Sequence, residues 1–229
     1  MEQLHNGYTL QIGDGCFPLS TDSIALADFV SLCRNARVLD LGSGCATLGL
    51  LLCAKDSTCK VTGIELNEIA HNCALENIRA NHLQERLVNI CADLRAISSL
   101  FKGAKFDCVV SNPPYFTSGP RSKTAPQARH EETCSLSELF HAASQALKFG
   151  GDFYLVHKPD RFAQICAYAN KENLEPKKVC LLRHSADNPI SLVVIQCRKG
   201  AKPGLVWHEA CLYNPDGTPT DYYRSLYHC

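Results

Sequence analysis

Residues 111–116 read SNPPYF and follow an apolar run, FDCVV. The two prolines offer carbonyl acceptors without N–H donors, and each restricts the preceding residue to extended backbone, so the turn is stiff. The segment therefore presents two fixed acceptors, the Asn112 side chain and the Pro113 carbonyl. An amine or amide nitrogen with two N–H donors fits this pair. We assign catalysis to Asn112, Pro113, Pro114 and Tyr115. The Tyr115 ring offers a surface on which a base could stack, and Phe116 a second wall.

A second set of residues lies in and after the loop of VLDLGSGCATLGL (38–50). Gly42 and Gly44 permit a tight strand-to-helix turn and a close approach of ligand to backbone. Glu65 follows at the end of the next apolar run, where an acid would accept both hydroxyls of a ribose. Asp40 could hold an amino group or order the loop N–H groups, and Asp93 would lie near an adenine edge. Each acid alone is commonly a helix cap, but together the three favour an adenosine-containing cofactor.

Alternating strands and helices are predicted to position these residues. Strands are expected at 36–42, 60–66, 88–93, 105–112 and 152–158, with helices at 46–55, 67–81, 135–150 and 161–170. In the helix over 67–81, Ile69, Cys73 and Ile78 are expected on the inner face. Two last strands, 177–184 and 191–200, have no helix-length segment between them and therefore predict an antiparallel pair.

This pattern predicts an α/β fold: a Rossmann-like, seven-stranded, mostly parallel sheet with helices on both faces and the last strand antiparallel. Ligands bind beyond the carboxyl ends of the strands in such sheets, so the glycine loop, the acids and the prolines belong to one edge. We expect an N-terminal flap at 1–35, the catalytic domain at 36–200 and a C-terminal extension at 201–229.

Composition narrows the class of protein further. The 229 residues carry 23 Lys and Arg against 23 Asp and Glu, so no global field indicates nucleic acid or membrane. The amino terminus has no apolar signal segment, and the run LGLLLCA is too short to span a bilayer, so we expect a cytoplasmic protein. None of the 14 cysteines is spaced as C-x-x-C, which favours packing over a metal or redox role, and no metal site is expected.

The motifs DLGSGCATLGL, GIELN and SNPPYF together resemble S-adenosylmethionine-dependent methyltransferases of the seven-stranded class. More narrowly, the chain resembles the bacterial tRNA1(Val) adenine N6-methyltransferase family, which acts on the adenosine beside the anticodon. The segments 13–30, 128–143 and 150–165 also carry this likeness. The resemblance implies S-adenosyl-L-methionine as cofactor, with Asp40, Gly42 and Gly44 at its methionine part, Glu65 at its ribose and Asp93 at its adenine. The remaining cofactor residues that it implies are Thr21, Asp22, Leu41, Leu66, Ala92 and Asn112.

The substrate is less closely specified by the residues themselves. The segment of asparagine and prolines is compatible with adenine, guanine, cytosine or a protein glutamine. Guanine in rRNA or a glutamine amide is therefore an alternative to adenine in tRNA. Segment 116–130 carries Arg121, Lys123 and Arg129 with no acid, and Arg198, Lys199 and Lys202 follow the last strand. Together they form a possible phosphate-contact rim for RNA, although a solvated surface would explain any one of them. A non-catalytic binding module is a third hypothesis, and a monomer is expected.

Overall fold

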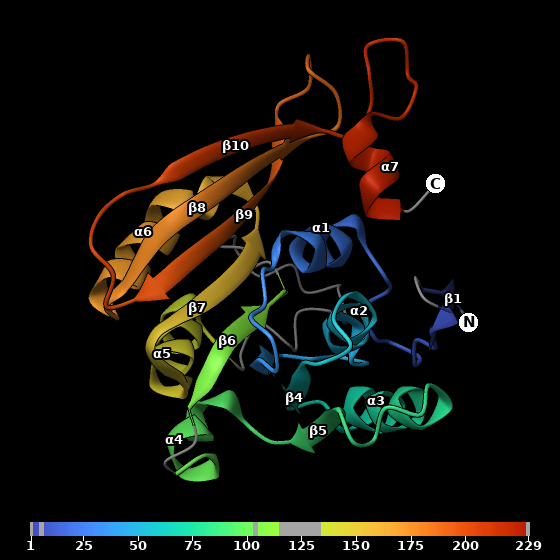
Figure 1. Ribbon diagram of the computed structural model, residues 1–229, viewed down its shortest axis with the longest axis vertical. Coiled ribbons are helices and arrows are strands. Elements are labelled where there is room, and N and C mark those ends of the chain that lie inside the picture. The colour runs from blue at the N-terminus through green and yellow to red at the C-terminus, as the bar shows by residue number, and fades with distance from the viewer. Residues whose placement is uncertain (1, 5–6, 103–104, 115–133, 228–229) are drawn as a thin grey trace, which may run out of the picture.

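The computed structural model describes residues 2–4, 7–102, 105–114 and 134–227. Its helices are α1 (Thr21–Phe29), α2 (Thr47–Lys55), α3 (Glu68–Ala80), α4 (Ile97–Leu100), α5 (Leu136–Ala146), α6 (Phe162–Lys171) and α7 (Asp221–Tyr227). Its strands are β1 (Glu2–Gln3), β2 (Thr9–Leu10), β3 (Arg37–Leu41), β4 (Lys60–Glu65), β5 (Leu87–Cys91), β6 (Phe106–Ser111), β7 (Leu147–His157), β8 (Leu174–Arg183), β9 (Ile190–Lys199) and β10 (Val206–Cys211). Strands β3 to β10 form one central sheet with helices against it, and β1 and β2 pair antiparallel in a separate two-stranded sheet (Figure 1).

The central sheet has eight strands in the order β10-β8-β9-β7-β6-β3-β4-β5. Five strands are parallel to one another, in the order β5-β4-β3-β6-β7. Strand β9 pairs antiparallel with both β7 and β8, as the sequence predicted. The Rossmann-like prediction is confirmed, with one strand more than the seven expected.

The additional strand is β10, which pairs in parallel with β8 from Val206↔Lys178 to Cys211↔Arg183. Its burial does not alternate, because its first four residues are all exposed at the sheet edge. The sequence of β10 therefore lacks the alternation of buried and exposed residues that predicts a strand. β10 extends the sheet, and the following α7 contacts both β10 and α1 (Figure 1).

Two apolar cores lie on the two faces of the sheet. One is shared by α1, α2 and α3 and includes Val38 of β3; the other is shared by α5 and α6 and includes Leu39. Alternation along β3 places Asp40 on the same face as Val38, the face of α1 to α3. The predicted helices on both faces are thus confirmed.

Two local expectations were wrong. The helix predicted to reach Gly150 ends at Ala146, because fully buried Leu147 pairs with Phe106 and already belongs to β7. Ile69 was expected on the inner face of α3 but is 62% exposed, whereas Cys73 and Ile78 are buried. Ile69 lies in the first turn of α3, beside the edge of the sheet where ligands bind in such folds.

Candidate active site

The loop from β3 to α2 has the backbone that its glycines permit. Gly42 and Gly44 have φ of +74° and +54°, in the left-handed region. The N–H groups of Gly42 and Ser43 both donate to the Ile64 carbonyl, at 2.9 and 3.0 Å, which fixes the turn against β4. An added Cβ at either glycine would meet no described heavy atom within 4 Å, so the outer side of the loop is open to a ligand.

Asp40 is a carboxyl buried at the end of β3. It is 1% exposed, and neither carboxylate oxygen has a hydrogen-bond partner among the described residues. Burial, together with the nearby Glu65 carboxylate, raises the pKa of Asp40 to about 8. An isolated buried carboxylate is costly, so this position suits a ligand that brings a positive charge or N–H donors.

Glu65 orders the glycine loop. Its Oε2 accepts from the Gly44 N–H at 2.8 Å and its Oε1 accepts from the Asn67 N–H at 2.7 Å. One carboxylate therefore joins the loop after β3 to the start of α3. Each carboxylate oxygen has a second lone pair, so Glu65 can still accept from ligand hydroxyls. The sequence suggested that Asp40 could order the N–H groups of the glycine loop. In the structure it is Glu65 that accepts from the Gly44 N–H.

Asp93 has structural partners. Its side chain caps the short 3₁₀ turn Leu94–Ala96 by accepting from the Arg95 N–H at 2.8 Å, and it forms an ion pair with the Arg95 side chain. Hydrogen bonds from Arg95 lower the pKa of the Asp93 carboxyl. Asp93 therefore acts as a helix cap. An adenine that contacted this carboxylate would have to share it with Arg95.

A buried polar network behind the loop escaped the sequence analysis. Asn89 of β5 donates through Nδ2 to Ser43 Oγ at 2.6 Å, and its Oδ1 lies 2.7 Å from His71 Nδ1 of α3. Gly63 of β4 makes room for this network, because a Cβ there would lie 2.5 Å from Asn89 Nδ2. The polar residues lie 46 and 18 positions apart in the sequence, so no local pattern indicates them.

Asn112 is held from outside its own strand. Its Nδ2 donates to Ser23 Oγ of α1 at 2.9 Å, which fixes the amide and so the direction of its Oδ1. The preceding Ser111 is fully buried and donates to the Leu41 carbonyl at 2.7 Å, which ties the end of β6 to the end of β3. Pro113 is buried and Pro114 half-buried. The sequence analysis missed Ser23.

The first turn of α1 contributes two further residues that the family resemblance assigns to the cofactor. Asp22 is half-buried, and burial raises the pKa of its carboxyl while nearby Lys158 opposes the rise. Thr21 Oγ1 lies 2.8 Å from the Tyr227 hydroxyl of α7. Its hydroxyl is therefore already engaged by the C-terminal helix.

Three apolar candidates lie around the same strand ends. Leu41 is buried in the core of α5 and α6, so its backbone, not its side chain, faces the loop. Leu66, directly after Glu65, is 45% exposed and leaves an open apolar surface at the rim. Ala92 is half-buried and donates its N–H to the Glu65 carbonyl at 3.0 Å.

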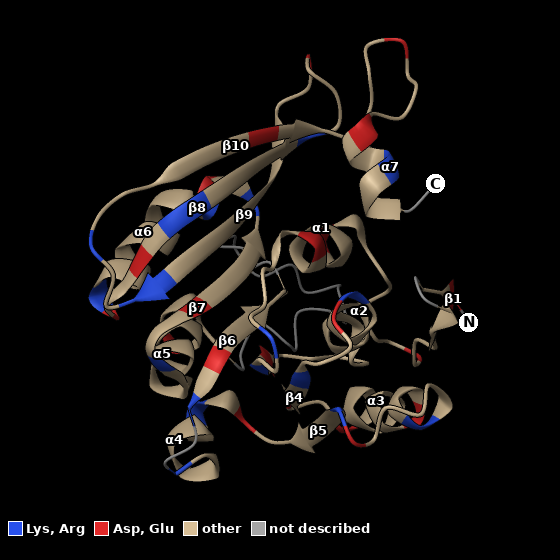
Figure 2. Cartoon of the chain, viewed as in Figure 1, with Lys and Arg blue, Asp and Glu red and all other residues tan. Residues whose placement is uncertain are grey.

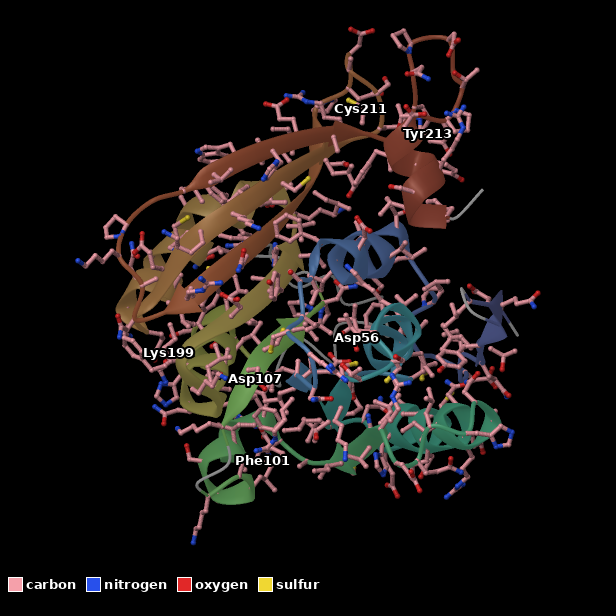
Figure 3. All side chains as sticks on the ribbon, viewed as in Figure 1. Asp56, Phe101, Asp107, Lys199, Cys211 and Tyr213 are labelled. Atoms are coloured by element: carbon pink, nitrogen blue, oxygen red, sulfur yellow. The ribbon has the colours of Figure 1, made fainter. Side chains whose placement is uncertain are left out.

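The remaining candidates divide into two groups. Tyr115, Phe116, Arg121, Lys123 and Arg129 lie outside the described residues. Arg198 and Lys199 lie toward the opposite end of the sheet: Arg198 pairs with Asp152 and Lys199 donates to the Ser144 carbonyl. Figure 3 shows Lys199 and Asp107 at that end and Tyr213 at the other. The rim expected from Arg198, Lys199 and Lys202 is therefore not beside Asn112.

Thiols and metal-ligating side chains add no further site over the described ranges. Every described cysteine is a free thiol, and Cys45 of the glycine loop is 2% exposed. Burial raises the pKa of the Cys73 thiol to about 11. No group of three His, Cys, Asp or Glu in that part of the chain could hold a metal ion. None of the described helices combines the length and apolar character needed to cross a membrane.

An open glycine turn, an unpartnered buried acid and an oriented amide at the carboxyl ends of parallel strands define a nucleotide-type cofactor site of an α/β enzyme. The family model of the methyltransferase small domain matches residues 21–164. The chain belongs to this methyltransferase family, which confirms the resemblance stated from the motifs.

Curated relatives agree with this assignment. The chain is 34% identical over 160 residues to the tRNA1(Val) (adenine(37)-N6)-methyltransferase of Shewanella halifaxensis, a match covering 69% of the chain and 64% of that relative. It is 30% identical over 166 residues to the protein of the same name from Bacteroides fragilis, covering 72% of the chain and 70% of the relative. The match thus spans less than two thirds of the Shewanella protein.

Solved structures show the same fold at lower identity. A predicted O-methyltransferase from Agrobacterium tumefaciens superposes with a TM-score of 0.75 at 18% identity, covering 91% of this chain and 96% of that one. The methyltransferase subunit of a type I restriction-modification system from Streptococcus thermophilus gives 0.66 at 17% identity, covering 94% and 52%.

Proposed function

We propose that this protein transfers a methyl group from S-adenosyl-L-methionine to the exocyclic N6 of an adenine in tRNA, the adenosine beside the anticodon of tRNA-Val. The observation that carries the proposal is the Asn112 amide, oriented by Ser23 at 2.9 Å at the end of β6. The names of the relatives, tRNA1(Val) (adenine(37)-N6)-methyltransferase, support adenine in tRNA as the substrate.

The residues present fit S-adenosyl-L-methionine. The unpartnered Asp40 carboxyl suits the amino group of its methionine part, and Glu65 retains acceptor capacity for ribose hydroxyls. Exposed Leu66 offers an apolar surface to an adenine ring. Two acids beside an open glycine turn would repel a phosphate, so a cofactor without phosphate is favoured over a dinucleotide.

The chain contributes positioning more than proton chemistry. Asn112 Oδ1 and the Pro113 carbonyl would accept the two N–H groups of the target amine and direct its lone pair toward the methyl donor. When bound, S-adenosyl-L-methionine would supply an activated methyl group to this lone pair and leave as S-adenosylhomocysteine, and the proton lost by the amine would pass to water. Tyr115 would stack on the base turned out of the RNA, at about 1–3 kcal/mol for such a contact.

The proposal includes the organisation of the chain. Residues 36–200 would bind the cofactor and carry the reaction, residues 1–35 would cover the cofactor, and 201–229 would extend the sheet. We place the reaction in the cytoplasm, where tRNA is modified, and expect a monomer, which light scattering of the purified protein would test.

The test is transfer of labelled methyl from S-adenosyl-L-methionine to unmodified total tRNA, followed by nucleoside analysis. Labelled N6-methyladenosine supports the proposal. A tRNA1(Val) transcript in which the adenosine beside the anticodon is replaced tests the position, because it should take up no label. Label in ribosomal RNA or protein instead of tRNA would keep the site chemistry and overturn the substrate. No transfer to any of them, despite cofactor binding by calorimetry, would indicate a binding module.

A further inference from the structure

The C-terminal helix α7 contacts the helix that holds Asn112. Figure 1 shows α7 beside α1, and the Tyr227 hydroxyl lies 2.8 Å from Thr21 Oγ1, across 206 residues of sequence. Leu226, next to Tyr227, is 4% exposed and belongs to the same apolar core as Leu26 of α1. The contact between the two helices is thus both apolar and hydrogen-bonded.

The Tyr227 ring lies at the end of a row of neighbouring aromatic rings, in which the first two pairs are tilted and the last, Tyr223–Tyr227, is stacked. Ring centroids are 4.7 Å apart for His184 and Tyr213, 5.1 Å for Tyr213 and Tyr223, and 4.5 Å for Tyr223 and Tyr227. The row starts at the end of β8 and crosses the C-terminal extension (Tyr213 is marked in Figure 3). These ring contacts restrain the rotation of the Tyr223 and Tyr227 rings, which limits the movement of the Tyr227 hydroxyl.

Two backbone hydrogen bonds attach this row to the central sheet. The Tyr213 N–H donates to the His184 carbonyl at 2.8 Å, and the Leu212 N–H donates to the Arg183 carbonyl at 3.1 Å. The extension therefore continues the β8–β10 pairing up to the start of the aromatic row. A displacement of α1 relative to the sheet would have to break the Thr21–Tyr227 contact.

The same turn of α1 reaches the reacting end of the site. Thr21 is the first residue of α1, and Ser23, two residues further, accepts the hydrogen bond from Asn112 Nδ2. Tyr227 on one side and Asn112 on the other thus hold one helical turn. This turn therefore connects the C-terminal helix with the amide that would hold the target amine.

We propose that Tyr227 is a positioning residue for methyl transfer: its hydroxyl fixes the first turn of α1, and through Ser23 it fixes the Asn112 amide. This inference rests on the proposed function, because it assigns Asn112 to the target amine. It gives the C-terminal extension, which lies outside the 21–164 family match, a part in catalysis.

The test is Tyr227→Phe, which keeps the stacked ring and removes only the hydroxyl. We expect faster hydrogen exchange in the peptide covering α1, and a kcat about three- to tenfold lower, as the loss of one hydrogen bond allows. The KM for tRNA should stay unchanged, since Tyr227 does not contact the RNA in this proposal. Tyr222→Phe is the matched control, because Tyr222 is a half-buried tyrosine of the same helix.

A second variant distinguishes positioning from general destabilisation. Thr21→Val should reproduce the effect of Tyr227→Phe, Thr21→Ser should restore it, and the double variant Thr21→Val with Tyr227→Phe should be no worse than either single one. Additive losses, or unchanged exchange in α1 with unchanged kcat, would overturn the inference. If the wild type transfers no methyl to tRNA, the proposed function fails, and the exchange of α1 still decides whether Tyr227 fixes this turn.

Discussion

Asn112 shows how the direction of a side chain can depend on a residue far away in the sequence. The stiffness of the two prolines sets the backbone of the turn, but the direction of the amide comes from Ser23, 89 residues earlier. A surface asparagine would sample several rotamers, and a hydrogen bond to a buried serine removes most of that freedom. The pair, rather than the asparagine alone, is the unit that presents a fixed acceptor.

Asn112→Ala should reduce methyl transfer at least about 100-fold, because the variant lacks one preorganised acceptor for the target amine. Cofactor affinity should change little, since Asp40 and Glu65 remain. Labelled-methyl transfer to tRNA and calorimetry with S-adenosylhomocysteine measure the two effects separately. Asn72→Ala, on the exposed side of α3, is the control. Joint loss of transfer and cofactor binding would contradict the role given to Asn112.

Asp40 predicts a pH dependence of stability with a definite sign. Its pKa is raised from 3.8 to about 8 in the folded protein, so the folded state binds more protons than the unfolded state between these values. The free energy of unfolding should therefore fall as pH rises from 5 to 8, by up to about 4 kcal/mol from this group. Asp40→Asn should remove most of that fall.

Urea unfolding of the wild type and Asp40→Asn at pH 5 and pH 8 measures this effect. The variant should gain stability relative to the wild type at pH 8 and lose affinity for S-adenosylhomocysteine at the same pH. Asp28→Asn, at an exposed acid of α1, is the control substitution. An equal free energy of unfolding of the wild type at pH 5 and pH 8 would contradict the raised pKa of Asp40.

At the scale of elements, the loop after β3 is held on three sides. The Ile64 carbonyl of β4 accepts two of its N–H groups, Glu65 accepts a third, and Asn89 of β5 bonds Ser43. The left-handed residues Gly42, Gly44 and Ala46 would otherwise make this a variable segment, and Ala46 adopts that backbone without the freedom of glycine. The hydrogen bonds preorganise the loop before any ligand enters.

Glu65→Ala should weaken cofactor binding by about 10- to 100-fold, because it removes both the ribose acceptor and the partner of the Gly44 N–H. Glu65→Gln keeps one acceptor oxygen and should lose less. Calorimetry with S-adenosylhomocysteine measures both variants, with Glu68→Ala in the exposed first turn of α3 as control. Normal affinity in Glu65→Ala would exclude the ribose assignment.

Gly63→Ala tests the network behind the loop. The new methyl group would lie 2.5 Å from Asn89 Nδ2 and 2.7 Å from Ser43 Oγ, so the Asn89–Ser43 bond must break or move. We expect a loss of about 1–3 kcal/mol in the free energy of unfolding, with weaker cofactor binding. Val88→Ala, at an exposed position beside Asn89, is the control for denaturant unfolding. Unchanged stability in Gly63→Ala would show that the network can shift without cost.

At the scale of the whole molecule, the sequence predicted the parts of the fold that buried periodicity determines. The inner strands are short apolar runs that are nearly continuous, as in β3, where four of five residues are buried. It did not predict β10, which forms because β8 offers a free edge, not because its own residues alternate. Motif residues were found because they are local, whereas Ser23, Asn89 and Tyr227 act across long separations that no pattern in one sequence reveals.

Surface charge on the whole molecule indicates where RNA would approach. Figure 2 shows basic positions in blue along the central sheet, with a group at the end of β9, the strand that ends at Lys199. Arg198, Lys199 and Lys148 of that end are paired with Asp152, backbone carbonyls and Asp107. Cations engaged in this way have fewer donors left for phosphates. An RNA that presents its base to Asn112 would instead use cations near the carboxyl ends of the strands.

Charge reversal at the two ends should therefore have different effects on tRNA binding. Lys202→Glu, at the end remote from Asn112, should change the dissociation constant less than about twofold. Arg121→Glu and Lys123→Glu, in the basic segment that follows the prolines in the sequence, should weaken binding and reduce the slope of log K against log salt by about one for each phosphate that is no longer neutralised. Filter binding across a salt series measures both. A weaker salt dependence in Lys202→Glu, with no change in the other two variants, would place the RNA at the opposite end of the sheet, away from the Asn112 amide that we propose holds its base.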